Sequence, residues 1–173
     1  LTRNKAQLSD DIWLGGEIGD SAAALGSILA SPEKIIEKNT DLASAYYFPQ
    51  PQIGLGQSLL GLANSAMDIS DGLLADLGHI LARSGVGAEI DYHALPLSKA
   101  VLHYIEETGD WQMPLSAGDD YELCFTIAAD KAVLLGEGDY HCIGHITEQQ
   151  QLSVMYNRQA FSFTQGGFEH FSR

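Results

Sequence analysis

The spacing of hydrophobic positions changes along the chain, and each spacing predicts one kind of element. From 121 to 128, apolar side chains alternate with other residues, which is typical of a strand with one buried face. From 73 to 81, leucine and isoleucine recur every three or four residues, which is typical of an amphipathic helix. Gly85 stands where this helix should end, because glycine readily adopts the left-handed conformation of a helix C-terminus.

The same patterns, together with glycine, proline and N-cap residues, predict the remaining elements. We expect strands at 11–16, 65–69, 86–92, 121–128, 140–147, 152–156 and 160–163. We expect helices at 20–30, 31–39, 55–63, 73–83, 98–107 and 130–135. The simplest packing of these elements is an α+β fold, a two-layer α/β sandwich with a mostly antiparallel sheet and helices on one face.

The composition is that of a globular protein with a strong negative charge. The 173 residues are 45% hydrophobic, and 9 Lys and Arg against 23 Asp and Glu give a net charge of −14. This charge makes duplex nucleic acid and anionic membrane surfaces poor partners. No apolar run approaches the roughly 20 residues of a membrane span. Two cysteines fit a reducing compartment, so we expect a cytoplasmic protein.

The segment from Asp68 to Gly72 carries the clearest candidate chemistry. It lies where a predicted strand gives way to a helix, and strand side chains two apart, such as Asp68 and Ser70, point the same way. The following turn should bring Asp71 close to Asp68. Two carboxylates suit Mg²⁺, which takes one or two of them and keeps waters or phosphates, while amides at the helix start can donate to a phosphate. The alternative is that Ser70 or Asp71 only caps the helix.

Three other segments leave two interpretations open. The acidic segment 118–122 is either the wall of a site that faces a cation or an ordinary turn. The glycine-rich turn at 15–21 either packs a helix closely or contacts phosphate, and the aromatic cluster at 168–171 is either a packed tail or a face for a planar ligand. Zinc-binding spacings and the Gly-x-Ser-x-Gly turn of many hydrolases do not occur in the sequence.

Two of these segments resemble motifs of the bacterial thiamine-monophosphate kinases. Residues 64–80 (Asn-Ser-Ala-Met-Asp-Ile-Ser-Asp-Gly-Leu-Leu-Ala-Asp-Leu-Gly-His-Ile) resemble the central motif of that family. Residues 116–126 resemble its Ser-Gly-Gly-Glu-Asp-Tyr-Glu-Leu segment, and 19–23 and 167–171 fit in the same order. The two central motifs together separate this family from its relatives, the aminoimidazole ribonucleotide and selenophosphate synthetases.

The resemblance implies an activity and a domain organisation. Members of the family transfer the γ-phosphoryl group of ATP to thiamine monophosphate with Mg²⁺, giving thiamine diphosphate and ADP. They have two halves, and the N-terminal half carries further Asp ligands and forms much of a homodimer. The chain begins at Leu1 in mid-pattern, so we expect 1–10 to be a connecting segment from a missing N-terminal half. Residues 11–173 would be a single C-terminal α+β domain, inactive alone.

The resemblance also assigns roles to individual residues. Asp68 and Asp71 would bind Mg²⁺, Ser70 and Arg3 would contact ATP, and Asp119 and Phe168 would contact the substrate. No catalytic base is expected, because the accepting phosphate oxygen is already ionised near neutral pH.

The sequence also departs from the family pattern, and other functions remain open. Lys5 and Ser9 replace two glycines near Arg3, Asp119 stands where glutamate is usual, and Gln52 stands where arginine is usual. One alternative is an ATP-dependent synthetase of the same superfamily with another small substrate. A second is a non-catalytic acidic domain that binds a partner through its sheet. A third possibility is self-association through an exposed apolar face.

Overall fold

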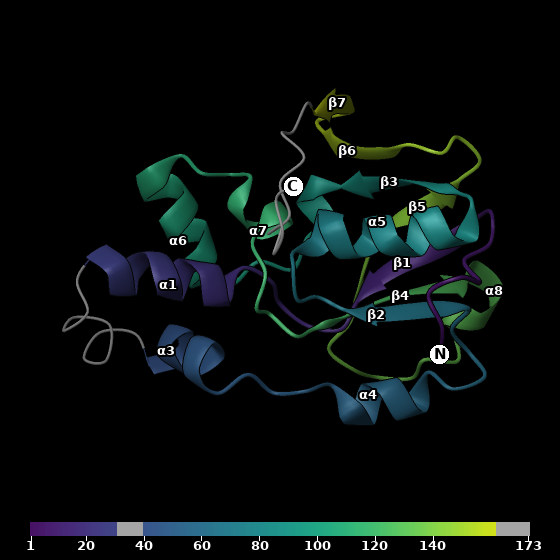
Figure 1. Ribbon diagram of the computed structural model, residues 1–173, viewed down its shortest axis with the longest axis horizontal. Helices are drawn as coiled ribbons and strands as arrows, with labels where there is room; N and C mark the ends of the chain where they lie inside the picture. The colour runs from purple at the N-terminus through teal and green to yellow at the C-terminus, as the bar shows by residue number, and fades with distance from the viewer. Residues whose placement is uncertain (31–39, 162–173) are drawn as a thin grey trace, which may run out of the picture.

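The computed structural model describes residues 1–30 and 40–161 (Figure 1). Its strands are β1 (Asp10–Leu14), β2 (Ser65–Asp68), β3 (Gly87–Asp91), β4 (Leu123–Ala128), β5 (His141–Thr147), β6 (Leu152–Tyr156) and β7 (Gln159–Phe161). Its helices are α1 (Asp20–Ala30), α3 (Thr40–Tyr47), α4 (Ile53–Ser58), α5 (Leu73–Ser84), α6 (Lys99–Thr108), α7 (Met113–Ser116) and α8 (Ala129–Ala132), with a 3-10 turn at Tyr92–Ala94. The helix expected at 31–39 lies outside the described residues.

The strands form one sheet in the order β2-β4-β1-β5-β3-β6-β7. Neighbouring strands are antiparallel except β3 and β6, which are parallel. The predicted α+β class and mostly antiparallel sheet are therefore confirmed. The predicted strand at 121–128 begins only at Leu123, because Asp119 and Tyr121 have positive φ angles of 66° and 55° that interrupt extended backbone.

Helix α5 covers one face of the sheet, as its amphipathic spacing predicts (Figure 1). Leu73, Leu77 and Ile80 are fully buried in one cluster with side chains of β1. Each such side chain contributes about 1.5–3 kcal/mol through burial. A smaller cluster with Leu59 and Phe125 lies on the opposite face of the sheet, because alternate side chains of a strand point to opposite faces. Helix α4 packs there, so helical segments contact both faces of the sheet.

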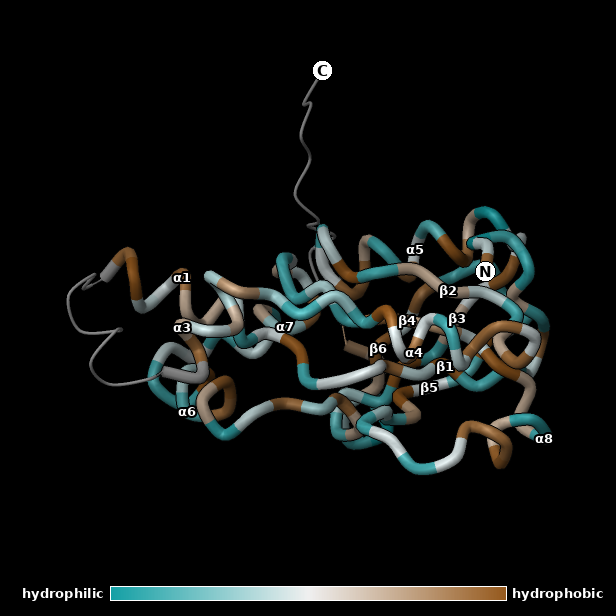
Figure 2. Tube along the Cα trace, turned by 90° about the horizontal axis from the view of Figure 1, so that it is seen from below, coloured by the Kyte–Doolittle hydropathy of each residue, from teal (hydrophilic) through white to brown (hydrophobic). Residues whose placement is uncertain are grey.

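A second group of helices lies at one end of the molecule. In Figures 1 and 2, α1, α3 and α6 gather at the end away from β2 and β4. Their apolar contacts form a separate cluster that includes Ala23, Leu42 and Val101. The sequence predicts neither α3 nor α7. Helix α7 is only four residues long and begins beside Pro114, so it has no hydrophobic period to detect. None of the helices in the described ranges is long and apolar enough to cross a membrane.

Candidate functional site

The connection from β2 to α5 is a tight loop whose conformation depends on Gly72. Strand β2 ends at Asp68 and α5 begins at Leu73, with Gly72 as the N-cap residue. Gly72 has φ 112°, and a Cβ there would lie 2.6 Å from the carbonyl oxygen of Ser116. The cap makes no side-chain hydrogen bond. The alternative that Ser70 or Asp71 serves only as the N-cap therefore does not describe this helix.

Asp76, in the first turn of α5, holds this loop through two hydrogen bonds. The side chain is fully buried, and its Oδ2 accepts the backbone N–H groups of Ser70 at 2.8 Å and Asp71 at 2.9 Å. Burial raises the pKa of Asp76, and the two backbone donors oppose that rise. These two amides are therefore engaged within the protein, and a phosphate at this helix would have to use later ones.

The acidic segment at 118–122 pairs with the same loop through its backbone. The N–H of Asp119 donates to the carbonyl of Ser70 at 3.0 Å, and the N–H of Tyr121 donates to the carbonyl of Ile69 at 2.8 Å. The N–H of Ile69 in turn donates to the carbonyl of Glu122 at 2.8 Å. The two motifs, distant in sequence, thus continue the β2–β4 pairing beyond Asp68.

Three carboxylates of these motifs influence the ionisation of the phenol of Tyr121. Its hydroxyl donates to Asp119 Oδ1 at 3.3 Å. The negative charge of Asp119, then partial burial, and then the charges of Asp68 and Asp71 raise the pKa of Tyr121. The backbone pairing of the two motifs and this shared effect on Tyr121 favour the interpretation that the carboxylate cluster of Asp68, Asp71 and Asp119 borders a common ligand.

The chemistry of this cluster fits Mg²⁺ held by few protein ligands. Among residues 1–30 and 40–161, no three His, Cys, Asp or Glu side chains are grouped as a metal site. Asp68 is exposed and Asp71 partly exposed, and both offer only oxygen. Mg²⁺ typically uses one or two carboxylates and fills its octahedron with waters and substrate phosphates. Asp68 at the end of β2 and Asp71 in the loop provide two accessible carboxylates of this kind.

The structure separates Arg3 from this cluster. The carbonyl oxygen of Arg3 accepts a hydrogen bond from Ser84 Oγ at 3.3 Å, at the last residue of α5. Asp71 precedes the first residue of the same helix. A helix of 12 residues is roughly 18 Å long, so the Arg3 backbone lies about that far from the loop. Phe168 lies outside the described residues.

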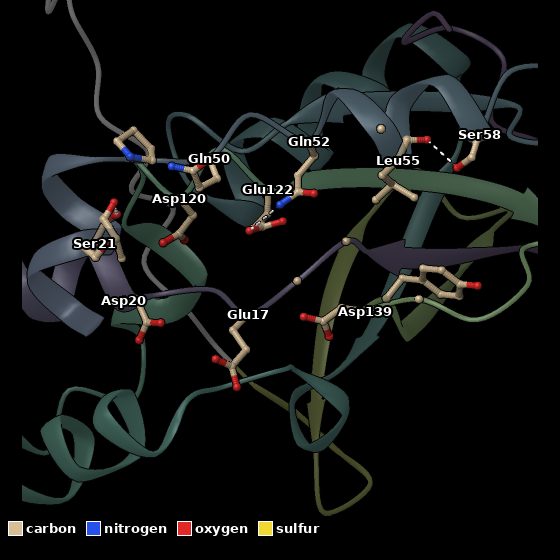
Figure 3. A pocket seen from close by; sticks show the side chains of 18 of the residues that line it. Glu17, Asp20, Ser21, Gln50, Gln52, Leu55, Ser58, Asp120, Glu122 and Asp139 are labelled. Carbon is tan, nitrogen blue, oxygen red and sulfur yellow. Dashed lines mark hydrogen bonds between the residues drawn. The ribbon is translucent and has the colours of Figure 1, made fainter. Parts of the chain in front are cut away.

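A large open cavity lies on the other side of the acidic segment (Figure 3). Its volume is about 810 Å³, and it lies between the β1–α1 connection, the segment before α4 and the loop before β5. Its lining holds six carboxylate side chains and, among the described residues, no Lys or Arg: Glu17, Asp20, Asp120, Glu122, Glu137 and Asp139. This charge disfavours a phosphate in the cavity.

Two of the cavity acids have strongly altered ionisation. Burial raises the pKa of Asp120 to about 7, although the N–H of Gly19 donates to both of its oxygens at 3.0 Å. Burial also raises the pKa of Glu122 to about 7, and Gln52 Nε2 donates to its Oε1 at 3.2 Å. The glycine-rich turn at 15–21 therefore donates to a protein carboxylate, and we find no support for the phosphate alternative there.

Comparison with known proteins identifies the family. A family model described as AIR synthase related protein, C-terminal domain, matches residues 10–157. The chain belongs to this family. The chain is also similar to several thiamine-monophosphate kinases. That of Haemophilus influenzae is 46% identical over 127 residues, which cover 73% of this chain and 39% of the relative. That of Escherichia coli K12 is 38% identical over 180 residues, covering 99% of this chain and 55% of the relative.

Solved structures of thiamine-monophosphate kinases support the same relationship. The structure titled AaThiL complexed with AMPPCP and TMP superposes with a TM-score of 0.80 at 31% identity. The superposition covers 98% of this chain and 53% of the chain in that structure. The chain thus spans about half the length of the relatives it matches.

The structure adds residues to the site that the sequence patterns do not single out. Asp76 looks like a polar residue on the helix surface, yet it is buried beneath the loop. Its position four residues after Gly72 is the only available signal. Asp120 and Glu122 fall within the predicted acidic segment, but their orientation toward a separate cavity depends on the irregular backbone at Asp119 and Tyr121.

Proposed function

We propose that this chain is the C-terminal part of an enzyme that transfers the γ-phosphoryl group of ATP to thiamine monophosphate, giving thiamine diphosphate and ADP. The backbone pairing of the Asp68–Gly72 loop with the acidic segment, which places the two motifs side by side, carries this proposal. Two relatives named thiamine-monophosphate kinase and the structure with AMPPCP and TMP support it. The whole activity belongs to a protein about twice as long as this chain.

We assign the residues of the cluster to distinct parts of this reaction. Asp68 and Asp71 would hold Mg²⁺, and Ser70, between them, would contact ATP. Asp119 would contact the substrate, whose thiazolium ring is cationic and therefore attracted to a carboxylate. Phe168 remains a proposed substrate contact. Arg3 remains a proposed nucleotide contact, on condition that the nucleotide extends toward the Ser84 end of α5.

The chemistry needs positioning and charge neutralisation more than proton transfer. The acceptor is a phosphate oxygen that is already largely ionised, so no catalytic base is required. The difficulty is that two anionic substrates repel each other. Mg²⁺, when bound, would neutralise part of that charge. The protein's contribution is a loop whose backbone is fixed on both sides, by Asp76 and by the acidic segment, so that its carboxylates need little reorganisation.

We propose in addition that the intact enzyme is a cytoplasmic homodimer. The two cysteines, which fit a reducing compartment, are the basis for the compartment. The dimer rests on the family resemblance alone. Size-exclusion chromatography with light scattering on the intact enzyme would measure the mass, and a monomer at working concentrations would contradict the dimer.

The first test is Asp71→Ala in a full-length enzyme that contains this chain. We expect turnover to fall at least 100-fold while the melting temperature changes by only a few degrees, because a partly exposed loop carboxylate contributes little to stability. Thiamine diphosphate formation and thermal melting are the measurements. Asp130→Ala, an exposed acid in α8 at the opposite end of β4, is the control and should leave both unchanged.

Two outcomes would refute this assignment. Equal turnover of Asp71→Ala at saturating Mg²⁺ would remove the metal role of Asp71. A panel of acceptors, read as ADP release, tests the substrate: ADP release with another small molecule and not with thiamine monophosphate would favour the superfamily synthetase.

A further inference from the structure

Asp76 occupies a position that helix formation does not explain. Its own N–H donates to the carbonyl of Gly72 at 3.0 Å, so its backbone already belongs to the regular helix. The side chain turns back past the helix end and accepts from two consecutive amides outside the helix. It therefore fixes the backbone of the loop, and the backbone in turn sets where the side chains of Ser70 and Asp71 emerge.

The burial of Asp76 is costly, which makes a purely structural role a poor account of it. The side chain is fully buried, as are Leu73 and Leu77 of the same helix, and within the described part of the chain its Oδ1 has no hydrogen-bond partner. An unsatisfied buried acceptor costs on the order of 1–3 kcal/mol. No Lys or Arg in the described ranges forms an ion pair with it. An apolar residue would pack there at lower cost, but it would release the Ser70 and Asp71 amides.

We propose that Asp76 is a positioning residue of the phosphoryl-transfer site, which holds the Ser70–Asp71 loop in the shape that allows Asp71 to meet Mg²⁺. The inference rests on the proposed function, because it concerns the same loop. It goes beyond that function in assigning a role to a residue that touches neither substrate nor metal. Residues that orient metal ligands in this way typically affect metal affinity 10- to 100-fold when replaced.

The test compares Asp76→Ala and Asp76→Asn in a full-length enzyme that contains this chain. Mn²⁺ binding followed by electron paramagnetic resonance, the Mg²⁺ concentration for half-maximal rate, and melting in EDTA are measured for each. We expect Asp76→Ala to weaken Mn²⁺ binding and raise the Mg²⁺ requirement about 10- to 100-fold. Asp76→Asn keeps one acceptor oxygen for both amides, so its loss should be several-fold smaller.

Asp10→Ala is the matched control for stability. Asp10 is also a buried carboxylate that accepts from a backbone N–H, of Gln7 at 2.9 Å, and from Asn64 Nδ2. It pairs with Ala128, at the end of β4 away from the loop. We expect the Asp10→Ala variant to melt at a lower temperature than the wild type, while its Mn²⁺ affinity and its Mg²⁺ requirement stay unchanged.

The possible results separate this inference from the proposed function. Lower melting of both Asp76 variants with wild-type Mn²⁺ affinity would overturn the positioning role, as would a wild-type enzyme that binds no Mn²⁺. If Asp76→Ala does not fold, Asp76→Asn alone decides, and wild-type metal dependence of that variant overturns the inference. In a further outcome, the wild type forms no thiamine diphosphate, while both Asp76 variants bind Mn²⁺ more weakly than the wild type does. That outcome would refute the kinase proposal and support the positioning role.

Discussion

Burial opposes the ionisation of several carboxyl groups in this chain, and its effect on the pKa is largest for Asp120 and Glu122. The pKa of each is raised to about 7, and neither faces a Lys or Arg in the described cavity lining. The amide of Gly19 lowers the pKa of Asp120 only partly. Gln52 offers Glu122 a neutral donor, and among the described residues Glu122 Oε2 is buried without a hydrogen-bond partner.

These raised pKa values predict a pH dependence of stability. A carboxyl whose pKa is higher in the fold than in the unfolded chain favours folding at low pH, and this contribution disappears as the pH rises toward 7. Between pH 5 and pH 8 we expect Asp120 to cost about 2 kcal/mol of stability. Urea unfolding at both pH values measures this.

Asp120→Asn is the variant that isolates the effect. Asparagine can still accept from Gly19 but does not titrate, so the loss of stability between pH 5 and pH 8 should be smaller than in the wild type. The same slope in both proteins would show that Asp120 ionises normally.

At the scale of elements, the loop and the acidic segment approach each other so closely that one position excludes a side chain. A Cβ on Gly118 would lie 2.0 Å from the carbonyl oxygen of Ser70 and 2.7 Å from its carbonyl carbon. Both atoms belong to the backbone of Ser70, which is already held in place by hydrogen bonds with Asp119 and Asp76. Gly118 is therefore required by contact between two elements, although its own φ is ordinary.

Gly118→Ala should therefore lower both stability and activity. We expect a loss of about 1–3 kcal/mol in the free energy of unfolding, since the backbone must shift to admit the methyl group. Gly78→Ala is the control: beyond its chain neighbours and the backbone of α5 itself, a Cβ at this position would have no atom of the described residues within 4 Å, and alanine favours helix. Chemical unfolding of both should give opposite signs. Equal stability of Gly118→Ala and wild type would mean that the two segments can move apart freely.

The extent to which sequence predicts these elements follows from their local signals. Strand β4 and helix α5 have clear hydrophobic periods, and both form where those periods predict. Helices α3 and α7 are short and lack such periods, and the parallel pairing of β3 with β6 is set by tertiary packing. The sequence alone therefore recovers the sheet-forming segments better than the arrangement of the small helices.

At the scale of the whole molecule, the site is predictable only in part for a similar reason. Asp68, Asp71 and Asp119 belong to recognisable motifs, and backbone hydrogen bonds hold the two motifs side by side in the structure. The burial of Asp76 depends on packing between α5 and the sheet, which no local pattern encodes. The acidic cavity likewise depends on three connections that are far apart in sequence.

The chain alone should not catalyse the proposed reaction. It spans 39% to 55% of the two kinases compared, and its loop offers two accessible carboxylates against the repulsion of two phosphorylated substrates. We expect no thiamine diphosphate from the purified 173-residue chain with ATP and Mg²⁺, measured by chromatography against the full-length enzyme. Product formed by the chain at a comparable rate would show that these residues suffice.

The four residues from Asp119 to Glu122 border two different spaces. Asp119 and Tyr121 belong to the carboxylate cluster, whereas Asp120 and Glu122 line the cavity behind it. An amino-acid exchange that adapts the cavity to a new molecule would thus also shift the acids beside the loop. Divergence at one of these spaces should be accompanied by compensating substitutions at the other, so the two would evolve together.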